Sequence, residues 1–190
     1  MGCANRYPSV ELYTKKMNEK KEQQVSLLDT QLVNKSQKLG FGEKIKFELN
    51  ESSMILKDKD SSYFKSFAVQ GKEGTKYKIE IRSFVSRGKE FYVAVPELRL
   101  VTSKNKAINL KPTSVSGTLP AVGPYRMIGE WEGEFRDSKP HYFVVTSDNR
   151  FLNKQVDKES AVLFAPGVFG ILNWKIFGHF MGEMDIVVTE

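Results

Sequence analysis

The chain has 190 residues, of which 40% are hydrophobic and 12% aromatic, so it can bury a sizeable core as one domain or as one domain with an arm. A mean hydropathy of −0.39, taken with this aromatic content, argues against intrinsic disorder. The single cysteine, Cys3, excludes a disulfide within the chain. The net charge is +6, and residues 61–111 hold 11 Lys and Arg against 4 Asp and Glu, so the basic character is concentrated in the middle of the chain.

The chain begins MGCAN, which places its only cysteine directly after a glycine. Gly2-Cys3 resembles the end of a bacterial lipobox, where cleavage of a signal peptide leaves a lipid-bearing cysteine as the first residue. The competing pattern, N-myristoylation of Gly2, prefers Ser or Thr at the sixth position, where this chain has Arg6. We therefore expect residues 1–8 to be a lipidated tether. Because Ala4 follows the cysteine, we expect a periplasmic protein anchored by lipid to the outer membrane.

Residues 9–30 have the pattern of a helix, with apolar residues at a spacing of three to four and Ser9 as a candidate N-cap. We expect residues 9–40 to form a helical arm and linker in front of the main domain. Such a helix can lie on the body of the protein, pair with a partner helix, or hold the globule away from the membrane, and the sequence leaves these alternatives open. The apolar positions are Val10, Tyr13, Met17, Val25 and Leu28.

The hydrophobic period changes to two at Lys44, which is typical of strands with one wet face. A long segment rich in Ser, Thr, Asn, Gly and Pro, residues 103–125, predicts a loop between two groups of strands. Short strands separated by turn signals predict an all-β fold, an antiparallel β-sandwich over residues 41–190 that is preceded by the N-terminal α-helical arm. The expected strands cover 44–50, 62–70, 76–86, 90–102, 126–137, 141–149 and 184–190.

The segment 162–182 is apolar and nearly long enough for a transmembrane helix, but it contains Pro166, several glycines and the polar Asn173, Lys175 and His179. We expect it instead to form a Gly-rich hairpin that covers one end of the sandwich. The alternative is that some of its aromatic residues stay exposed as a binding platform. The residues expected to fill the core are Phe164, Phe169, Ile171, Trp174, Ile176 and Phe180.

Residues with catalytic or metal-binding chemistry are sparse. The two histidines, His141 and His179, do not stand at metal-ligand spacing from each other or from a cysteine. The glutamates of the motif EWEGE share one face of an expected strand, where a solvated surface is far commoner than a catalytic pair. We therefore expect no enzyme activity, no metal site and no cofactor.

Two stretches, SSYFKSFAVQGKEGTKYKIEIRSFV (61–85) and YVAVPELRLVTSKNKAI (92–108), form a Phe-rich strand, a Gly turn, a strand ending in Arg-Ser, and a strand containing Pro. This pattern resembles the repeating core of the maltose operon periplasmic protein family. APGVFGI, followed by a final Val-rich strand, is similar to the closing hairpin of that family. The resemblance implies a non-enzymatic periplasmic β-sandwich.

These patterns together predict a non-enzymatic accessory lipoprotein that binds a protein or a glycan of the envelope. Large aromatic rings supply much contact energy, which makes Trp131, Trp174, Phe177 and His179 the candidate partner-binding residues.

The alternative function is a basic β-domain that binds nucleic acid or anionic membrane through residues 61–111. Its candidate contacts are the basic residues Lys76, Lys78, Arg82 and Arg87.

Overall fold

The computed structural model describes residues 10–57, 61–87, 91–104, 106–118, 126–165 and 168–190. Of residues 10, 21, 86, 87, 118, 157–165 and 168–174 it describes the backbone alone. The expected lipidation site, Cys3, lies outside the described residues.

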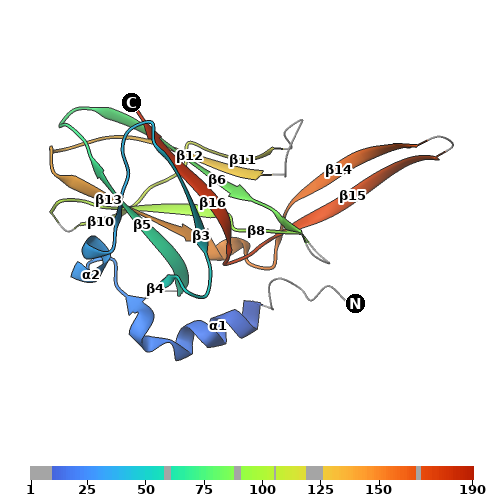
Figure 1. Cartoon of the computed structure of the whole chain (residues 1–190), viewed down its shortest axis with the longest axis horizontal. Helices are drawn as coiled ribbons and strands as arrows, with labels where there is room; N and C mark the ends of the chain where they lie inside the picture. The colour runs from blue at the N-terminus through green and yellow to red at the C-terminus, as the bar shows by residue number, and fades with distance from the viewer. Residues whose placement is uncertain (1–9, 58–60, 88–90, 105, 119–125, 166–167) are drawn as a thin grey trace.

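Two packed sheets form the body of the protein, which confirms the β-sandwich predicted from the sequence (Figure 1). Most strand pairs are antiparallel, and each parallel pair includes one strand of two or three residues, namely β1, β8 or β2. Sheet A holds, in spatial order, β1 (Gln24–Val25), β4 (Met54–Leu56), β5 (Ser62–Gln70), β13 (Pro140–Ser147), β9 (Pro96–Val101) and β10 (Ala107–Asn109), with β2 (Gln37–Lys38) also paired to β5. Sheet B holds β11 (Ser114–Thr118), β12 (Arg126–Glu134), β6 (Lys76–Phe84), β16 (Gly182–Thr189) and β3 (Lys44–Leu49).

The main core lies between these sheets and follows the alternation of the sequence. In β6, Tyr77, Ile79 and Ile81 are buried, whereas the residues between them are only partly buried or exposed. From sheet A, Phe67 and Phe143 face them in the same hydrophobic cluster. The period of two in KYKIEIR therefore divides an inner apolar face from an outer polar face.

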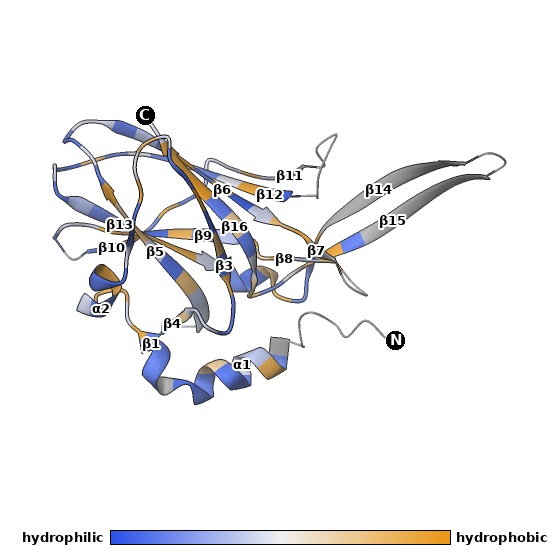
Figure 2. Ribbon diagram, in the orientation of Figure 1, coloured by the Kyte–Doolittle hydropathy of each residue, from blue (hydrophilic) through white to orange (hydrophobic). Residues whose placement is uncertain are grey.

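The N-terminal segment lies on the body of the protein. The predicted helix is shorter than expected: α1 covers Val10–Glu19, a 3-10 turn follows at Lys21–Gln23, and α2 covers Thr30–Asn34. Figure 2 shows α1 as mostly hydrophilic, and its apolar residues Tyr13 and Met17 are both buried. The Lys16 ammonium lies 2.9 Å from the Glu51 carboxylate and helps to fix α1 to the sandwich.

A second, smaller core lies on the outer side of sheet A. Here Leu32 of α2 packs against the face of the sheet that points away from sheet B. Residues of β1 and α2 thus cover the outer face of sheet A. The other buried members of this core are Val25, Leu56, Phe64, Val101 and Val144.

A third sheet, sheet C, contains β14 (Gln155–Ala165), β15 (Val168–Gly178), β8 (Phe91–Val93) and β7 (Ser86–Arg87). The segment predicted to cover the sandwich is a hairpin, but β14 and β15 extend away from the body (Figure 1), so that part of the prediction is wrong. At the base of the hairpin, Ile176 is buried as predicted, and so is Phe180 beyond β15. The side chains of Phe164, Phe169, Ile171 and Trp174 lie outside the described part.

Gly129 in β12 provides the space that the Trp131 ring occupies two residues further along the same strand. A methyl group at Gly129 would overlap the Trp131 ring and would lie 3.2 Å from Cγ of Pro96. We expect Gly129→Ala to lower the free energy of unfolding by about 1–3 kcal/mol, measured by chemical denaturation. Gly182→Ala is the control, because its nearest neighbour would be Cβ of Ala94 at 3.4 Å, and it should change stability much less. Equal losses in both variants would contradict this packing.

The hydroxyl group of Tyr63 is buried and finds no hydrogen-bond partner among the described residues. Burial raises the pKa of Tyr63 to about 12, and the charge of Glu51 adds to the shift. The unfolded chain releases the Tyr63 proton near pH 10, whereas the folded chain holds it until about pH 12. The contribution of Tyr63 to the free energy of unfolding is therefore complete below pH 10 and is lost as the pH rises from about 10 to 12. We expect Tyr63→Phe to be at least as stable as the parent near pH 7 and to lose less stability between about pH 9 and 11, measured by urea denaturation. If the parent and Tyr63→Phe lost the same free energy of unfolding between pH 9 and 11, the raised pKa of Tyr63 would be contradicted.

Candidate functional site

A cleft of about 690 Å3 lies where β9 of sheet A approaches β11 and β12 of sheet B. This volume is in the range of ligand-binding clefts. Its walls are mainly apolar, and charged residues stand among them. The lining residues are Val95, Pro96, Glu97, Leu98, Asn109, Leu110, Lys111, Pro112, Val115, Trp131, Asp148, Arg150 and Phe151.

The segment that joins β10 to β11 forms one wall of the cleft and is held by both sheets. The Leu110 N–H donates to the Leu98 carbonyl at 3.1 Å, and the Thr113 N–H donates to the Glu130 carbonyl at 2.8 Å. The indole Nε1 of Trp131 donates to the Leu110 carbonyl at 3.3 Å. The backbone of this wall is therefore fixed without any ligand.

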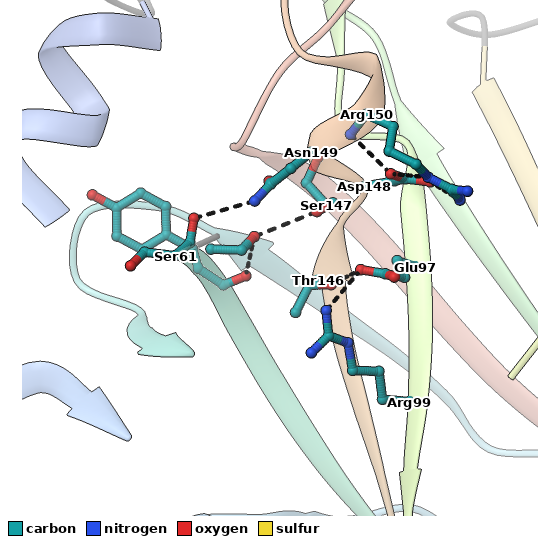
Figure 3. Close-up of polar contacts among 10 residues, drawn as sticks. Ser61, Glu97, Arg99, Thr146, Ser147, Asp148, Asn149 and Arg150 are labelled. Carbon is teal, nitrogen blue, oxygen red and sulfur yellow. Dashed lines mark hydrogen bonds and ion pairs between the residues drawn. The ribbon is translucent and has the colours of Figure 1, made fainter. Parts of the chain in front are cut away.

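Asp148 and Arg150 both line the cleft and form an ion pair with each other, which Figure 3 shows. Asp148 caps the short 3-10 turn Asn149–Phe151 by accepting from the Arg150 N–H at 3.0 Å, and its Oδ2 lies 2.6 Å from Nη2 of Arg150. Hydrogen bonding to this carboxylate raises the pKa of Arg150 above its ordinary value. The Asp148 side chain is 7% exposed and that of Arg150 79%, so the guanidinium presents the positive charge to solvent.

Glu97 supplies a further charged group to the cleft. Its Oε2 accepts from the Thr146 hydroxyl at 3.1 Å and from Nη2 of Arg99 at 3.4 Å, as Figure 3 shows. The carboxylates of Glu97 and Asp148 are thus each held by a cation. Such a site can orient a polar ligand group by charge and hydrogen bonding.

The strand β11 borders the cleft and forms one edge of sheet B. Among the described strands it pairs with β12 alone. Its sequence SVSGT contains no charge and no proline, which are common protections of an edge strand. Val115 of β11 is 45% exposed, and Phe151 of the cleft is 39% exposed. An apolar cleft therefore stands next to a strand edge that no described strand covers.

Two of the predicted partner-binding residues are core residues. Trp131 is 1% exposed and His179 is 2% exposed, so the prediction that they are surface contacts is wrong. The pattern EWEGE itself puts Trp131 on the face opposite to the glutamates, which is the inner face of sheet B. Phe177 is half-buried, with its ring centroid 6.3 Å from that of Tyr92. The side chain of Trp174 lies outside the described residues.

Both histidines are buried, and their rings pack against other side chains of the protein. The Met181 N–H donates to Nδ1 of His179 at 3.2 Å, and the ring of Tyr13 meets the His179 ring edge-on at 5.4 Å between centroids. His179 thereby joins α1 to the end of β15. His141 is also buried, and its ring packs edge-on against Phe135.

The predicted basic residues of β6 lie on a surface of mixed charge. The strand register brings the glutamates of β12 beside them, so Lys78 Nζ lies 2.8 Å from Glu130 Oε1. This hydrogen bond raises the pKa of Lys78 and lowers that of Glu130. Arg82 pairs with Glu80, and the side chain of Arg87 lies outside the described part.

The register of sheet B assigns 6 Lys or Arg and 7 Asp or Glu to this outer face, so their charges nearly cancel. The excess of positive charge in residues 61–111 of the sequence therefore does not produce a basic face here. The cations are Lys44, Lys46, Lys76, Lys78, Arg82 and Arg126, and the anions are Glu48, Glu80, Glu130, Glu132, Glu134, Glu183 and Asp185.

Within the described residues, no group of three or more His, Cys, Asp or Glu side chains could hold a metal ion. The same part of the chain contains no helix with the length and apolar character needed to cross a membrane.

The sequence did not predict the cleft, because its residues come from strands that are distant in the chain. Pro96 and Pro112, and the turn that begins at Asp148, were its only local signals. None of these signals shows that β9 lies beside β12.

Comparisons with known proteins place the chain in no family. No protein-family model matches it, and no curated protein matches it. Among solved structures, the chain is similar to the pre-peptidase C-terminal domain of a collagenase from Bacillus anthracis, with a TM-score of 0.36 and 10% sequence identity over 81% of this chain and 94% of that one.

Proposed function

We propose that the protein is a non-enzymatic binding protein of a bacterial envelope, and that its cleft holds an extended segment of a partner protein. The observation that carries this proposal is the position of the apolar cleft beside an edge of β11 that no described strand covers. An extended peptide can add to such an edge through backbone hydrogen bonds and place alternate side chains in an adjacent pocket.

The residues around the cleft suit this mode of binding. Val115 and Phe151 offer exposed apolar surface to a side chain of the partner. Arg150, Glu97 and Lys111 offer charges of both signs at the border, which favours a segment with a matching order of charges. A glycan of the envelope is the other ligand class that the sequence suggests, and the experiment below distinguishes the two.

The envelope location rests on the motif Gly2-Cys3. A lipid on Cys3 would hold the sandwich at a membrane and keep the cleft near envelope partners. A single acyl chain gives weak membrane binding, whereas the several chains of a bacterial lipoprotein give stable anchoring.

Position-specific photo-crosslinking in bacteria tests the cleft. With benzoylphenylalanine in place of Val115, we expect one specific adduct, which Phe151→Asp removes because it puts a charge in the apolar cleft. Leu12 is the matched control position, since it is 43% exposed against 45% for Val115 but lies on α1. Mass spectrometry of the adduct then identifies a polypeptide or a glycan. The absence of an adduct at position 115, or the same adducts at position 12, would contradict the proposal.

Intact mass of the protein recovered from membranes tests the lipid anchor. When the full gene is expressed in a Gram-negative bacterium, we expect a chain that begins at Cys3 and carries two or three acyl groups. Cys3→Ser should leave the protein unacylated and release it from the outer membrane. An unmodified chain that retains Met1 or Gly2 would rule out the lipoprotein assignment.

A further inference from the structure

The hairpin formed by β14 and β15 is a separate projection of the backbone. The two strands pair with each other from Gln155 to Ala165, and β15 pairs with β8 only over residues 176–178. No other described strand pairs with residues 157–175. Figure 1 shows the hairpin extending away from both sheets of the sandwich, with no other labelled element beside its outer half.

The outer part of this hairpin, residues 161–165 and 168–172, contains no polar side chain. We call these ten residues the distal segment; their sequences are AVLFA and VFGIL. Cross-strand register pairs such as Val162 with Ile171 and Phe164 with Phe169 are therefore apolar throughout. Successive residues of a strand belong to opposite faces, so both faces of the hairpin carry only apolar residues here. β6 and β12 of sheet B differ, because along most of their length apolar or small residues alternate with charged residues.

A band of polar and amphipathic residues follows directly on the sandwich side of the distal segment. Its register pairs are Ser160 with Asn173, Glu159 with Trp174, and Lys158 with Lys175. Two lysines at directly opposed positions repel each other unless an anion lies near them. Trp and Lys next to an apolar segment are typical of the headgroup region of a membrane, where the indole and the ammonium remain at the polar level.

We infer that the distal segment docks into the surface of a lipid bilayer. A protein groove would cover one face of the hairpin, whereas acyl chains surround both faces, which suits a segment that is apolar on both. The five residues of each strand extend roughly 16 Å, which is long enough to reach the acyl chains of one leaflet but too short to cross the ~30 Å hydrocarbon core.

The backbone limits how deeply the hairpin enters the bilayer. A two-stranded hairpin has two open edges, and unpaired N–H and C=O groups are costly inside the hydrocarbon core. The hairpin therefore does not cross the membrane. It enters shallowly, with its outermost residues among the upper acyl chains and the pairs near Ala161 at the level where water and headgroups can satisfy the backbone. This membrane contact is independent of the partner-binding cleft and of any lipid on Cys3.

Vesicle co-sedimentation tests the inference on the full chain carrying Cys3→Ser, which removes any acyl anchor. The vesicles contain phosphatidylethanolamine and phosphatidylglycerol. We expect the protein to bind them at low and high salt alike, and the double variant Phe164→Asp with Phe169→Asp to bind at least about tenfold more weakly. The thermal unfolding midpoint of the double variant should stay unchanged, because the distal segment pairs only with itself.

Phe151→Asp is the matched control for this experiment, since it also puts a charge in place of an exposed apolar residue, but at the cleft. It should retain vesicle binding while losing the crosslink from position 115. The hairpin double variant should show the reverse. Failure of the cleft proposal and failure of the membrane proposal therefore give different results.

Insertion depth supplies a second measurement that does not depend on the double variant. A nitrobenzoxadiazole label attached at Phe164→Cys should be quenched by lipids brominated on the acyl chain, whereas the same label at Lys175→Cys should be quenched much less. Three results would overturn the inference: equal quenching at both positions, vesicle binding that high salt abolishes, or oligomers without vesicles that the Phe164 and Phe169 changes dissociate. The last result would make the hairpin an interface between copies of this chain.

Discussion

The fold depends on the burial of sheet A on both of its faces. In β5, Phe67 belongs to the core shared with sheet B, whereas Phe64 belongs to the outer core beneath α2. In β13, Phe143 and Val144 divide between the two cores in the same way. A sheet with two apolar faces needs two covers, and the chain provides the second one from its N-terminal segment. This requirement explains why residues 24–34 pack on the outer face of sheet A, whereas Tyr13 and Met17 of α1 belong to the core between the sheets. The same part of the chain adds β1 and β2 to sheet A.

Strands with one solvent-exposed face were predictable from the sequence, whereas contacts between distant segments were not. β3, β5, β6 and β16 agree with the predicted strands within about two residues, because strict alternation marks both the strand and its inner face. The docking of α1 was not predictable, since its narrow apolar stripe suits the body of the protein as well as a partner helix. The short strands β10 and β11 lie in a segment whose Ser, Thr and Gly content is typical of a loop.

The functional predictions from charge and from aromatic residues failed where they depended on which strands lie side by side. The basic residues of β6 and the glutamates of β12 are about fifty positions apart in the sequence, yet the register joins them into one nearly neutral face. Composition along the chain therefore overstated the positive potential of this surface. For Trp131 the local pattern was enough to predict burial, because its neighbours Glu130 and Glu132 belong to the opposite face of the strand. The cleft could be predicted only from the complete topology, since its walls come from both sheets.

The position of β16 in sheet B makes the sandwich depend on contacts between distant parts of the chain. Among the described strands β16 is the last in sequence, and it lies between β6 and β3, which do not pair with each other. Without residues 182–189, β3 would have no neighbour among the described strands of sheet B. Residues 182–187 pair with residues 44–49, so the fold has a high contact order, and sheet B is complete only when these two distant segments meet.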